Sequence, residues 1–575
     1  MKIQKIIFVT TLIITLFSCE NSSNNGNNDE GKAKKSGGEI IIPIDSYFKA
    51  VKPTHVLKIQ TAQISGQIFE SLVKYDCDDL NILPSLAEKW DISEDGLTYT
   101  FYLRKDVKYH DNKCFIDGIG RNVTTEDVSD MFYRAYDSNI ENTAYAIFQN
   151  TVAGGDDYYN GLTEKISGVT FDENTVSITL VELSNTFLSK LLTIFGSIVP
   201  KESFSSDVWT PVGTGPFMYN AIETNSELVV LNKNHKYWMK DSNNVQLPYL
   251  EKLSFKYYSN DDQRMDDFWN KDISIVKNVP ITQISEVLED RIADFKGKEA
   301  KYILESIPQM STSYLEFNMD SEIFKDKRVR QAISLAIDRK KLVEKTLKNQ
   351  AFEIGKFGIT PPLPKIYKGY DFSGIEKSGY TRNSVKAKEL LAEAGYPNGK
   401  GFPALSAEFK MQNDRYLIMS EIQNQLKSVL NINMAIEQVE FNKLLENNST
   451  GTADIFEQQW IGDFASPESF LINFYGKLVP DVKGEPSLIN GGRYINDKFD
   501  ELFEKGMSSR TIEESQEFFA EAEKAMLEDP AIVVLFYGES LWLKQSELKG
   551  FHTNGMGYLD FTSVYLIKTK VETVK

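Results

Sequence analysis

Alternating apolar and polar residues predict half-buried strands in the first third of the chain. In the segment 97–104 every second residue is apolar, namely Leu97, Tyr99, Phe101 and Leu103. The segment 175–180 repeats this alternation. Successive side chains of a strand point to opposite faces, so the pattern indicates strands with one face in a core.

A second period, close to 3.6 residues, predicts amphipathic helices. After Asp326 the apolar residues fall on one helical face, namely Val329, Ala332, Ile333, Ala336 and Ile337. Another amphipathic run, 385–394, stops at Gly395 with a proline just beyond, as helices commonly end. Thr124 and Thr125 precede two acidic residues, which is the pattern of a helix start. Strand and helix signals alternate without a fixed repeat, which predicts an α/β protein and neither a solenoid nor a propeller.

The N-terminus has the pattern of an export signal. Lys2 and Lys5 precede an apolar run at 6–17, which is too short to span a bilayer but suits a signal peptide. Leu-Phe-Ser-Cys at 16–19 resembles the lipobox of bacterial lipoproteins. That resemblance implies cleavage of residues 1–18 and lipidation of Cys19; the alternative is a signal peptide in which Cys19 falls by chance. The polar segment 19–38 is predicted to be a flexible tether.

Composition and charge narrow the class of the remaining chain. It has 575 residues, of which 41% are hydrophobic and 25% charged, an ordinary globular balance. The net charge of −18 disfavours a nucleic-acid partner, since phosphates would be repelled. Only four histidines and three cysteines occur, and we expect neither a metal nor a cofactor. No run of about 18 apolar residues follows the N-terminus, which excludes a membrane bundle.

Several short motifs follow one another along the chain: Ala-Glu-Lys-Trp at 87–90, Gly-Thr-Gly-Pro-Phe at 213–217, Asn-His-Lys-Tyr-Trp at 234–238, Val-Arg-Gln-Ala-Ile at 329–333 and Trp-Ile-Gly-Asp at 460–463. In kind and order they resemble the extracytoplasmic solute-binding proteins (family 5) of peptide ABC importers. Each motif is weak alone, but together they extend from about residue 40 to about residue 540.

The resemblance implies an α/β, two-lobed periplasmic-binding-protein (Venus-flytrap) fold of type II, hinged by two strand crossings, with an additional α/β domain inserted in the first lobe. We place lobe I at 39–75, 191–305 and 528–575, the additional domain at 76–190, and lobe II at 306–527.

Enzymatic signatures are absent from the sequence, so we expect no catalytic residue. There is no His-Glu-x-x-His, no Gly-x-Ser-x-Gly and no P-loop. The glycine pair around Thr214 is followed by Pro216, which suits a turn into a strand and not a phosphate-binding helix start. The resemblance places this turn at the rim of the cleft, where Thr214 would touch the ligand.

Asp463 is the main candidate for ligand binding. An isolated carboxylate among apolar neighbours such as Trp460 is costly to bury, and a cationic ligand would remove that cost. In peptide-binding relatives the Asp of the matching Trp-x-x-Asp holds the peptide N-terminus, and the resemblance implies this role for Asp463. The alternative is that Asp463 caps a helix starting at 466–468 while Trp460 belongs to the core. We also include Ile59 and Tyr537 among the candidate ligand-binding residues.

Two features leave the ligand and the redox state open. Glu457 stands where an oligopeptide-binding relative has an arginine that helps to hold ligand C-termini, and an acid cannot pair with a carboxylate. Relatives on this fold also bind nickel, haem and sugars. Cys77 and Cys114 could close a disulfide outside the cytoplasm or remain two buried thiols.

The sequence therefore predicts a monomeric, lipid-anchored binding protein of the cell envelope, facing the periplasm or the extracellular space. It would capture di- or oligopeptides between its lobes and deliver them to the permease subunits of an ABC importer. The alternatives are a lipoprotein hydrolase acting on polysaccharide or peptide, and a binder of the same fold for a sugar or metal chelate. A helical glycan-binding lipoprotein is contradicted by the strand content.

Overall fold

The computed structural model describes residues 37–45, 52–53, 59–77, 79–140, 144–204, 209–280, 283–284, 287, 301–482 and 484–567. The predicted signal peptide, Cys19 and the tether up to residue 36 lie outside the described residues. Of the helices in this described part, none is long and apolar enough to cross a membrane.

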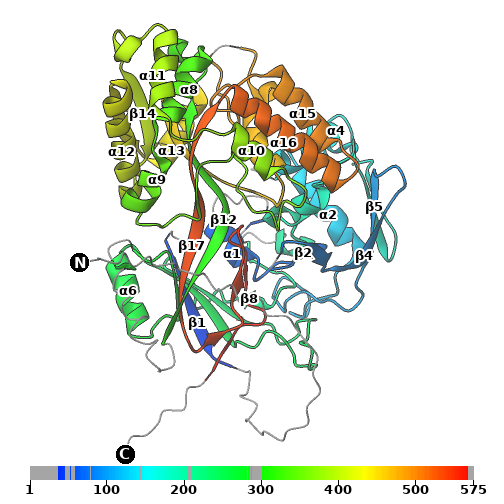
Figure 1. The fold of residues 1–575 in the computed structure, drawn as a ribbon. Coiled ribbons are helices and arrows are strands. Elements are labelled where there is room, and N and C mark those ends of the chain that lie inside the picture. The colour runs from blue at the N-terminus through cyan, green and yellow to red at the C-terminus, as the bar shows by residue number, and fades with distance from the viewer. Residues whose placement is uncertain are drawn as a thin grey trace, which may run out of the picture. The chain divides into compact units, whose positions relative to one another are not determined.

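Lobe I is built on a four-stranded sheet in the order β1-β10-β9-β8 (Figure 1). Its first strand lies parallel to β10, whereas the other neighbours are antiparallel. Ile40, Ile42 and Ile44 alternate along β1 and are buried in the core below α1. The strands and helices of this lobe are β1 (Glu39–Ile44), α1 (Ile59–Ser65), β8 (Phe217–Tyr219), β9 (Leu228–Lys233), β10 (Lys252–Tyr257), α6 (Asp261–Trp269), β18 (Leu548–Lys549), β19 (His552–Thr553), β20 (Leu559–Asp560) and β21 (Tyr565–Leu566).

A second α/β unit, the additional domain, has its own four-stranded sheet in the order β4-β5-β7-β6. The two predicted strands are confirmed as β5 and β7, whose buried residues alternate as expected. A short hairpin, β2 and β3, precedes the sheet. The elements of the additional domain, with this hairpin, are β2 (Val73–Tyr75), β3 (Ile82–Pro84), β4 (Ala87–Ile92), β5 (Thr98–Leu103), α2 (Thr125–Ala135), α3 (Tyr145–Phe148), α4 (Gly155–Tyr159), β6 (Val169–Phe171), β7 (Thr175–Thr179) and α5 (Phe187–Leu191).

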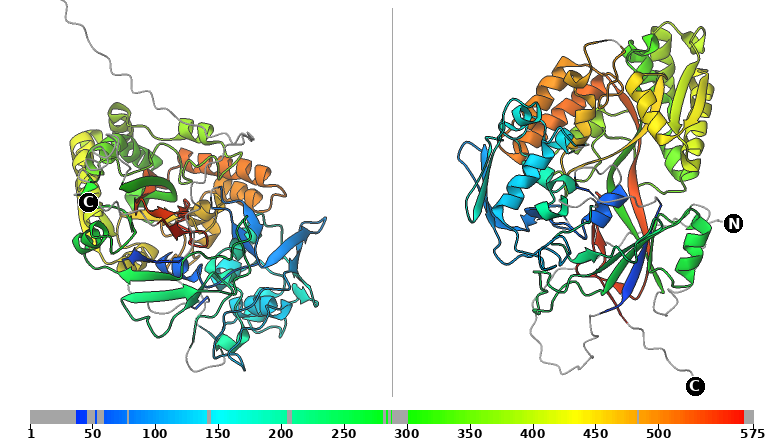
Figure 2. Two further views of the ribbon diagram at one scale, coloured as in Figure 1. Left: turned by 90° about the horizontal axis from the view of Figure 1, so that it is seen from below. Right: turned by 180° about the vertical axis from the view of Figure 1, so that it is seen from behind.

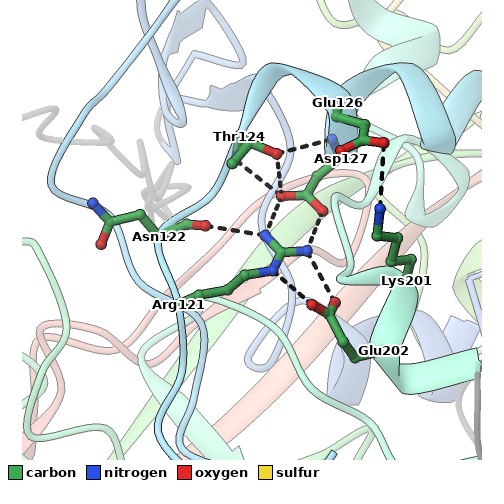
Figure 3. Close-up of polar contacts among 7 residues, drawn as sticks. All are labelled: Arg121, Asn122, Thr124, Glu126, Asp127, Lys201 and Glu202. Atoms are coloured by element: carbon green, nitrogen blue, oxygen red, sulfur yellow. Dashed lines mark hydrogen bonds and ion pairs between the residues drawn. The ribbon is translucent and has the colours of Figure 1, made fainter. Parts of the chain in front are cut away.

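The predicted start of α2 is confirmed and is tied to a distant segment. Thr124 caps the helix, and its backbone N–H donates to Asp127 Oδ2 at 2.9 Å in a capping box. Both carboxylate oxygens of Asp127 accept from the guanidinium of Arg121 at 2.7 Å (Figure 3). The same guanidinium binds Glu202 at 2.8 and 2.9 Å, which lowers the pKa of that carboxyl. Arg121 therefore fixes the start of α2 against the segment 201–204.

A seven-stranded mixed sheet in the order β11-β17-β12-β16-β14-β15, with β13 also on β17, extends from lobe I into lobe II. The predicted helices are confirmed: α8 follows the cap Asp326, and α11 ends just before Gly395 at φ 100°. β11 (Ile275–Lys277) packs with β1 in the core of lobe I. The other elements are β12 (Tyr302–Phe317), α8 (Lys327–Ala336), α9 (Arg339–Lys341), β13 (Glu353–Ile354), α10 (Phe372–Ser378), α11 (Ser384–Glu393), β14 (Leu405–Lys410), α12 (Asn413–Leu430), β15 (Met434–Val439), α13 (Phe441–Thr450), β16 (Ile455–Ile461), α14 (Glu468–Leu471), α15 (Asp497–Met507), α16 (Ile512–Glu528) and β17 (Ile532–Gln545).

Two long antiparallel strands, β12 and β17, join the lobes (Figures 1 and 2). Their ladder is interrupted between Pro308 and Thr312, and again between Ser313 and Tyr314. Proline lacks a backbone N–H, and an interrupted ladder lets strands bend locally. This pair has the form of the predicted hinge of two strand crossings; the residue boundaries of the lobes given above stay predictions.

The additional domain also contacts lobe II. Tyr75 and Leu80, at the tip of the hairpin β2–β3, are buried in the same core as Phe470. The Thr186 hydroxyl donates to Glu468 Oε2 at 2.9 Å, and the Asn185 side chain donates to the Ser509 carbonyl at 2.6 Å. These contacts connect the two sides of the interlobe region in this structure.

A buried carboxyl in lobe II, that of Glu523, makes the stability of the protein depend on pH. Glu523 on α16 accepts hydrogen bonds from the Thr360 N–H at 2.9 Å and from the Tyr370 hydroxyl, and burial raises its pKa to about 7. The native state therefore keeps a proton that the unfolded chain releases above pH 4.5. Stability is lost as the pH rises from 4.5 to 7, by about 3 kcal/mol at about 1.4 kcal/mol per pKa unit.

Glu523→Gln, which cannot ionise, should gain about 3 kcal/mol over the wild type as the pH rises across that window. Urea unfolding at a series of pH values measures the difference. Glu517→Gln, an exposed position on the same helix, is the control and should show no such trend. Parallel pH profiles for Glu523→Gln and the wild type would contradict the prediction.

Candidate functional site

A cavity of about 550 Å³ lies between the lobes. On the lobe I side it is lined by residues of α1, by Glu70 and Lys74, and by the segment 556–560. The lobe II side contributes Phe441 and residues 459–463. Its volume falls within the range of about 300–1,000 Å³ that is typical of small-ligand sites.

Backbone contacts fix Asp463 at the edge of this cavity. Gly462 ends the strand: its N–H donates to the Met310 carbonyl at 2.9 Å, and a Cβ there would lie 2.8 Å from Phe470. The backbone N–H of Asp463 donates to Ser469 Oγ at 2.7 Å. The turn is thus set by main-chain contacts, and the carboxylate itself is left to the cavity.

The environment of the Asp463 carboxylate would suit a cationic group. None of the described residues donates a hydrogen bond to it. The side chain is reached by solvent in the cleft, but the surrounding protein limits its hydration and raises its pKa to about 6. A cationic ligand would restore the stabilisation that water gives a carboxylate elsewhere.

The structure argues against one of the two interpretations of the Trp-x-x-Asp motif, the helix cap. Helix α14 begins at Glu468 after Pro467 and has no side-chain cap, so Asp463 does not cap it. Trp460 is only half-buried and lines the cavity, and its indole N–H donates to the Ser469 carbonyl at 2.6 Å. The motif therefore presents both side chains to the cavity, not to the core alone.

Glu70 lines the opposite wall and is saturated with hydrogen bonds. Its carboxylate accepts from the Thr214 hydroxyl at 2.7 Å, from the Tyr237 hydroxyl at 3.0 Å and from the Trp238 indole N–H at 3.1 Å. Burial raises the pKa of Glu70, although these donors oppose the shift. The three donors hold the carboxylate in one orientation.

The Gly-Thr-Gly turn at 213–215 positions Thr214 against the Glu70 carboxylate. A Cβ on Gly213 would lie 2.1 Å from the Ile68 carbonyl, so only glycine permits this close approach. The ring of His110 holds the turn: Nε2 donates to the Gly215 carbonyl at 2.9 Å, and burial lowers the pKa of His110 to about 4. Thr214 is consequently 1% exposed, and it contacts Glu70 and does not line the cavity.

The other two predicted residues lie differently. Tyr537 on β17 is fully buried in lobe II, where its hydroxyl donates to the Gly358 carbonyl at 2.7 Å, and it does not line the cavity. Ile59 is the first residue of α1, and its side chain lies outside what the structure describes. Of the five sequence candidates, the cavity thus brings together Trp460 and Asp463.

Glu457 is paired within the protein. It is 2% exposed on β16 and forms an ion pair with Arg415 at the start of α12. Arg415 also contacts the side chains of Ser313 and Gln459. The charge of Arg415 is therefore matched within the protein, and neither Arg415 nor Glu457 is among the residues that line the cavity.

The disulfide considered for Cys77 and Cys114 is not formed: both are thiols in the structure. The Cys77 sulfur lies 3.9 Å from Asp560 Oδ2, beside the interlobe cavity. Cys114 packs against the core of the additional domain, and its N–H donates to Asn112 Oδ1 at 3.0 Å. The two residues belong to different surroundings, so of the two alternatives the structure has the thiols.

Sequence reasoning missed most of the cavity wall. Glu70 and Lys74, Phe441, and Asp560 all line it, but these three parts of the chain lie far apart in the sequence. No local pattern marks them, because only the closure of the chain brings them together. Within the described part of the chain, no three His, Cys, Asp or Glu side chains are grouped to hold a metal ion.

Two lobes joined by a pair of long strands, with a ligand-sized cavity between them, define an extracytoplasmic solute-binding protein of the type II fold. Residues 81–479 match the family described as bacterial extracellular solute-binding proteins, family 5 Middle, and the chain belongs to this family. The resemblance inferred from the motif order is thereby confirmed.

Known relatives cover nearly the whole chain. The dipeptide-binding protein of Escherichia coli is 24% identical over 87% of this chain and 89% of that protein, and haem-binding protein A of Haemophilus influenzae is 25% identical over 96% and 95%. Among solved structures, DppA from Helicobacter pylori in complex with the peptide STSA has a TM-score of 0.74 at 25% identity, over 93% of this chain and 100% of that one. The oligopeptide-binding protein OppAIV of Borrelia burgdorferi has a TM-score of 0.73 at 27% identity, over 92% and 100%.

Proposed function

We propose that this protein captures short peptides in the interlobe cavity and delivers them to the permease of an ABC importer, itself catalysing nothing. The observation that supports the peptide is Asp463: a carboxylate without a hydrogen-bond donor among the described residues, facing a largely apolar cavity. A peptide's α-ammonium supplies the missing charge, and its side chains would contact Trp460 and Phe441.

The positions of the charged residues that line the cavity explain why a bound ligand would favour closure of the two lobes. Asp463 lies on lobe II, while Glu70 and Lys74 lie on the wall formed by lobe I and the hairpin β2–β3. A ligand that touches both walls binds the closed arrangement better than the open one and shifts the population toward closure.

Ligand identity is tested directly by native mass spectrometry of the purified protein and by thermal shift. The probe is a pool of tripeptides with random side chains and free termini, added after any co-purified ligand has been removed by unfolding and refolding. Co-purified peptide masses and a raised melting temperature are expected. If a sugar or metal chelate co-purifies and the protein does not respond to the pool, the ligand is one of those compounds and not a peptide. Unchanged pool masses after incubation distinguish a binding protein from a hydrolase.

A lipid anchor is part of this proposal. Residues 16–19 match the lipobox pattern, and two or three acyl chains hold a protein firmly on a membrane. The protein would work as a monomer at the cell envelope, facing the periplasm or the extracellular space, without a nucleic-acid partner or a cofactor.

Cys19→Ser should abolish labelling with radioactive palmitate and release the protein from membranes, because the rest of the sequence has no second apolar run of anchoring length. Asn21→Ser, two residues into the tether, is the matched control and should remain labelled and membrane-bound. Continued labelling of the Cys19→Ser protein would contradict the anchor.

A further inference from the structure

Four charged side chains line the interlobe cavity, and two of them are already bound within the protein. Glu70 accepts from three donors, and Asp560 accepts from the Thr562 N–H at 2.7 Å. Asp463 and Lys74 are the other two. They have opposite signs and come from different parts of the chain, the hairpin β2–β3 and the turn after β16.

Lys74 is placed in the cavity by the strand that carries it. It is the central residue of β2, and its two strand neighbours, Val73 and Tyr75, are buried in hydrophobic cores. Successive side chains of a strand alternate, so the burial of these neighbours turns Lys74 away from the cores. The register with β3 pairs Lys74 with Leu83 and fixes its position along the wall.

The ammonium of Lys74 has only a weak partner. Its Nζ lies 3.7 Å from the Met239 sulfur, and no carboxylate of the described residues lies within ion-pair distance of it. Glu70 attracts it through space, but the Glu70 oxygens are occupied by hydroxyl and indole donors. An ammonium can donate three hydrogen bonds, and thioether sulfur is a poor acceptor. Lys74 therefore retains donors for an anionic group in the cavity.

We propose that Lys74 binds the ligand's C-terminal carboxylate, so that the cavity selects short zwitterionic peptides held between Asp463 and Lys74. This inference rests on the proposed function, and it assigns the carboxylate site to the hairpin β2–β3. The alternative position on lobe II is closed, because Glu457 is an acid and its partner Arg415 is already charge-matched. A ligand with both termini free links the two walls, and a ligand lacking either charge leaves one of the two groups unmatched.

The test combines changes of the ligand with changes of the protein. The tripeptide pool is prepared with free termini, with an amidated C-terminus, and with an acetylated N-terminus, and the best binder is then made in all three forms for calorimetry. Amidation should weaken binding to the wild type roughly 10–100-fold, as expected for the loss of a charge-assisted hydrogen bond.

Lys74→Met should weaken binding of the free peptide to a similar extent and should no longer distinguish the free from the amidated form. Lys74→Arg keeps the charge and should retain the distinction. Lys89→Met, an exposed lysine on β4 away from the cavity, should behave as the wild type. The amidation arm needs only wild-type protein, so it stands even where a variant folds poorly.

The outcomes separate this inference from the proposed function. Equal binding of amidated and free peptide, together with weaker binding of the acetylated form, overturns the role of Lys74 and leaves peptide capture intact. If Lys74→Met still binds the amidated peptide more weakly than the free peptide, another residue binds the carboxylate. A pool that binds in none of its forms overturns both proposals.

Discussion

Asp463→Asn should lower the affinity for a free peptide by about 1.5–3 kcal/mol, or roughly 10–100-fold in Kd. Asparagine keeps the size of the side chain and can still accept a hydrogen bond, but it removes the charge that faces the peptide's α-ammonium. The backbone contacts of residue 463 with Ser469 do not involve the carboxylate, so the turn itself should be retained. Calorimetry with the best tripeptide from the pool measures the effect.

Acetylation of the peptide N-terminus gives the second half of a double-mutant cycle. It should weaken wild-type binding as much as Asp463→Asn does, and the combined change should cost less than the sum, because both remove the same pair. Asp560→Asn is the matched control: it lines the same cavity, but its carboxylate is bound to the Thr562 N–H, so it should not couple to acetylation. Equal affinities of the wild type for acetylated and free peptide would contradict the role of Asp463.

The same carboxyl predicts a pH dependence of binding. In the ligand-free protein the pKa of Asp463 is about 6, so the carboxylate is mostly ionised at pH 7 and mostly protonated at pH 5. The peptide ammonium stays charged over this interval. Affinity should therefore fall about tenfold from pH 7 to pH 5 in the wild type and change little in Asp463→Asn. A wild-type affinity that is flat with pH would place the ammonium elsewhere.

The local patterns predicted local structure well. The alternation at 97–104 gave β5 because the same period that marks a strand also decides which side chains are buried. The threonines before α2 were recognisable because a helix cap is satisfied within a few residues, although the clamp by Arg121 and Glu202 was not.

The cavity was predicted only where a motif marked it. Trp460 and Asp463 stand within four residues of each other, whereas Lys74 and Asp560 approach them only through the fold. Thr214 was recognised within its turn, but the approach of the glycines to Ile68 buries it behind Glu70. A sequence pattern reports neighbours along the chain, and a binding site is made of neighbours in space.

Glu457 also shows that a sequence pattern does not reveal contacts between distant residues. Its ion pair with Arg415 gives the prediction with the largest effect on stability. The sequence showed that an acid there cannot hold a ligand carboxylate, but not what holds the acid. Glu457 is 2% exposed and its partner Arg415 is 11% exposed, so both charges are largely removed from water. Burial raises the pKa of Glu457, and the attraction of Arg415 opposes that shift. The carboxylate is thus kept at its position by a residue from another element.

Arg415→Met should destabilise the protein by about 3–5 kcal/mol, because it leaves a buried carboxylate without its counter-charge. Replacing both partners, as in Arg415→Met with Glu457→Leu, should restore most of the loss, since an apolar pair of similar volume avoids the desolvation of both charges. Lys443→Met is the control in the same lobe: Lys443 and Glu446 are 54% and 63% exposed, and breaking that pair should cost less than about 1 kcal/mol.

Urea unfolding of the four proteins at pH 7 measures these differences. A double variant that is as unstable as Arg415→Met would mean that packing of the arginine stem, and not charge pairing, stabilises this part of the sheet. Peptide affinity gives an independent readout. The double variant should bind the tripeptide as the wild type does, because the matched pair offers no charge to either terminus, whereas a loss of affinity specific for the free carboxylate would return the C-terminal site to lobe II.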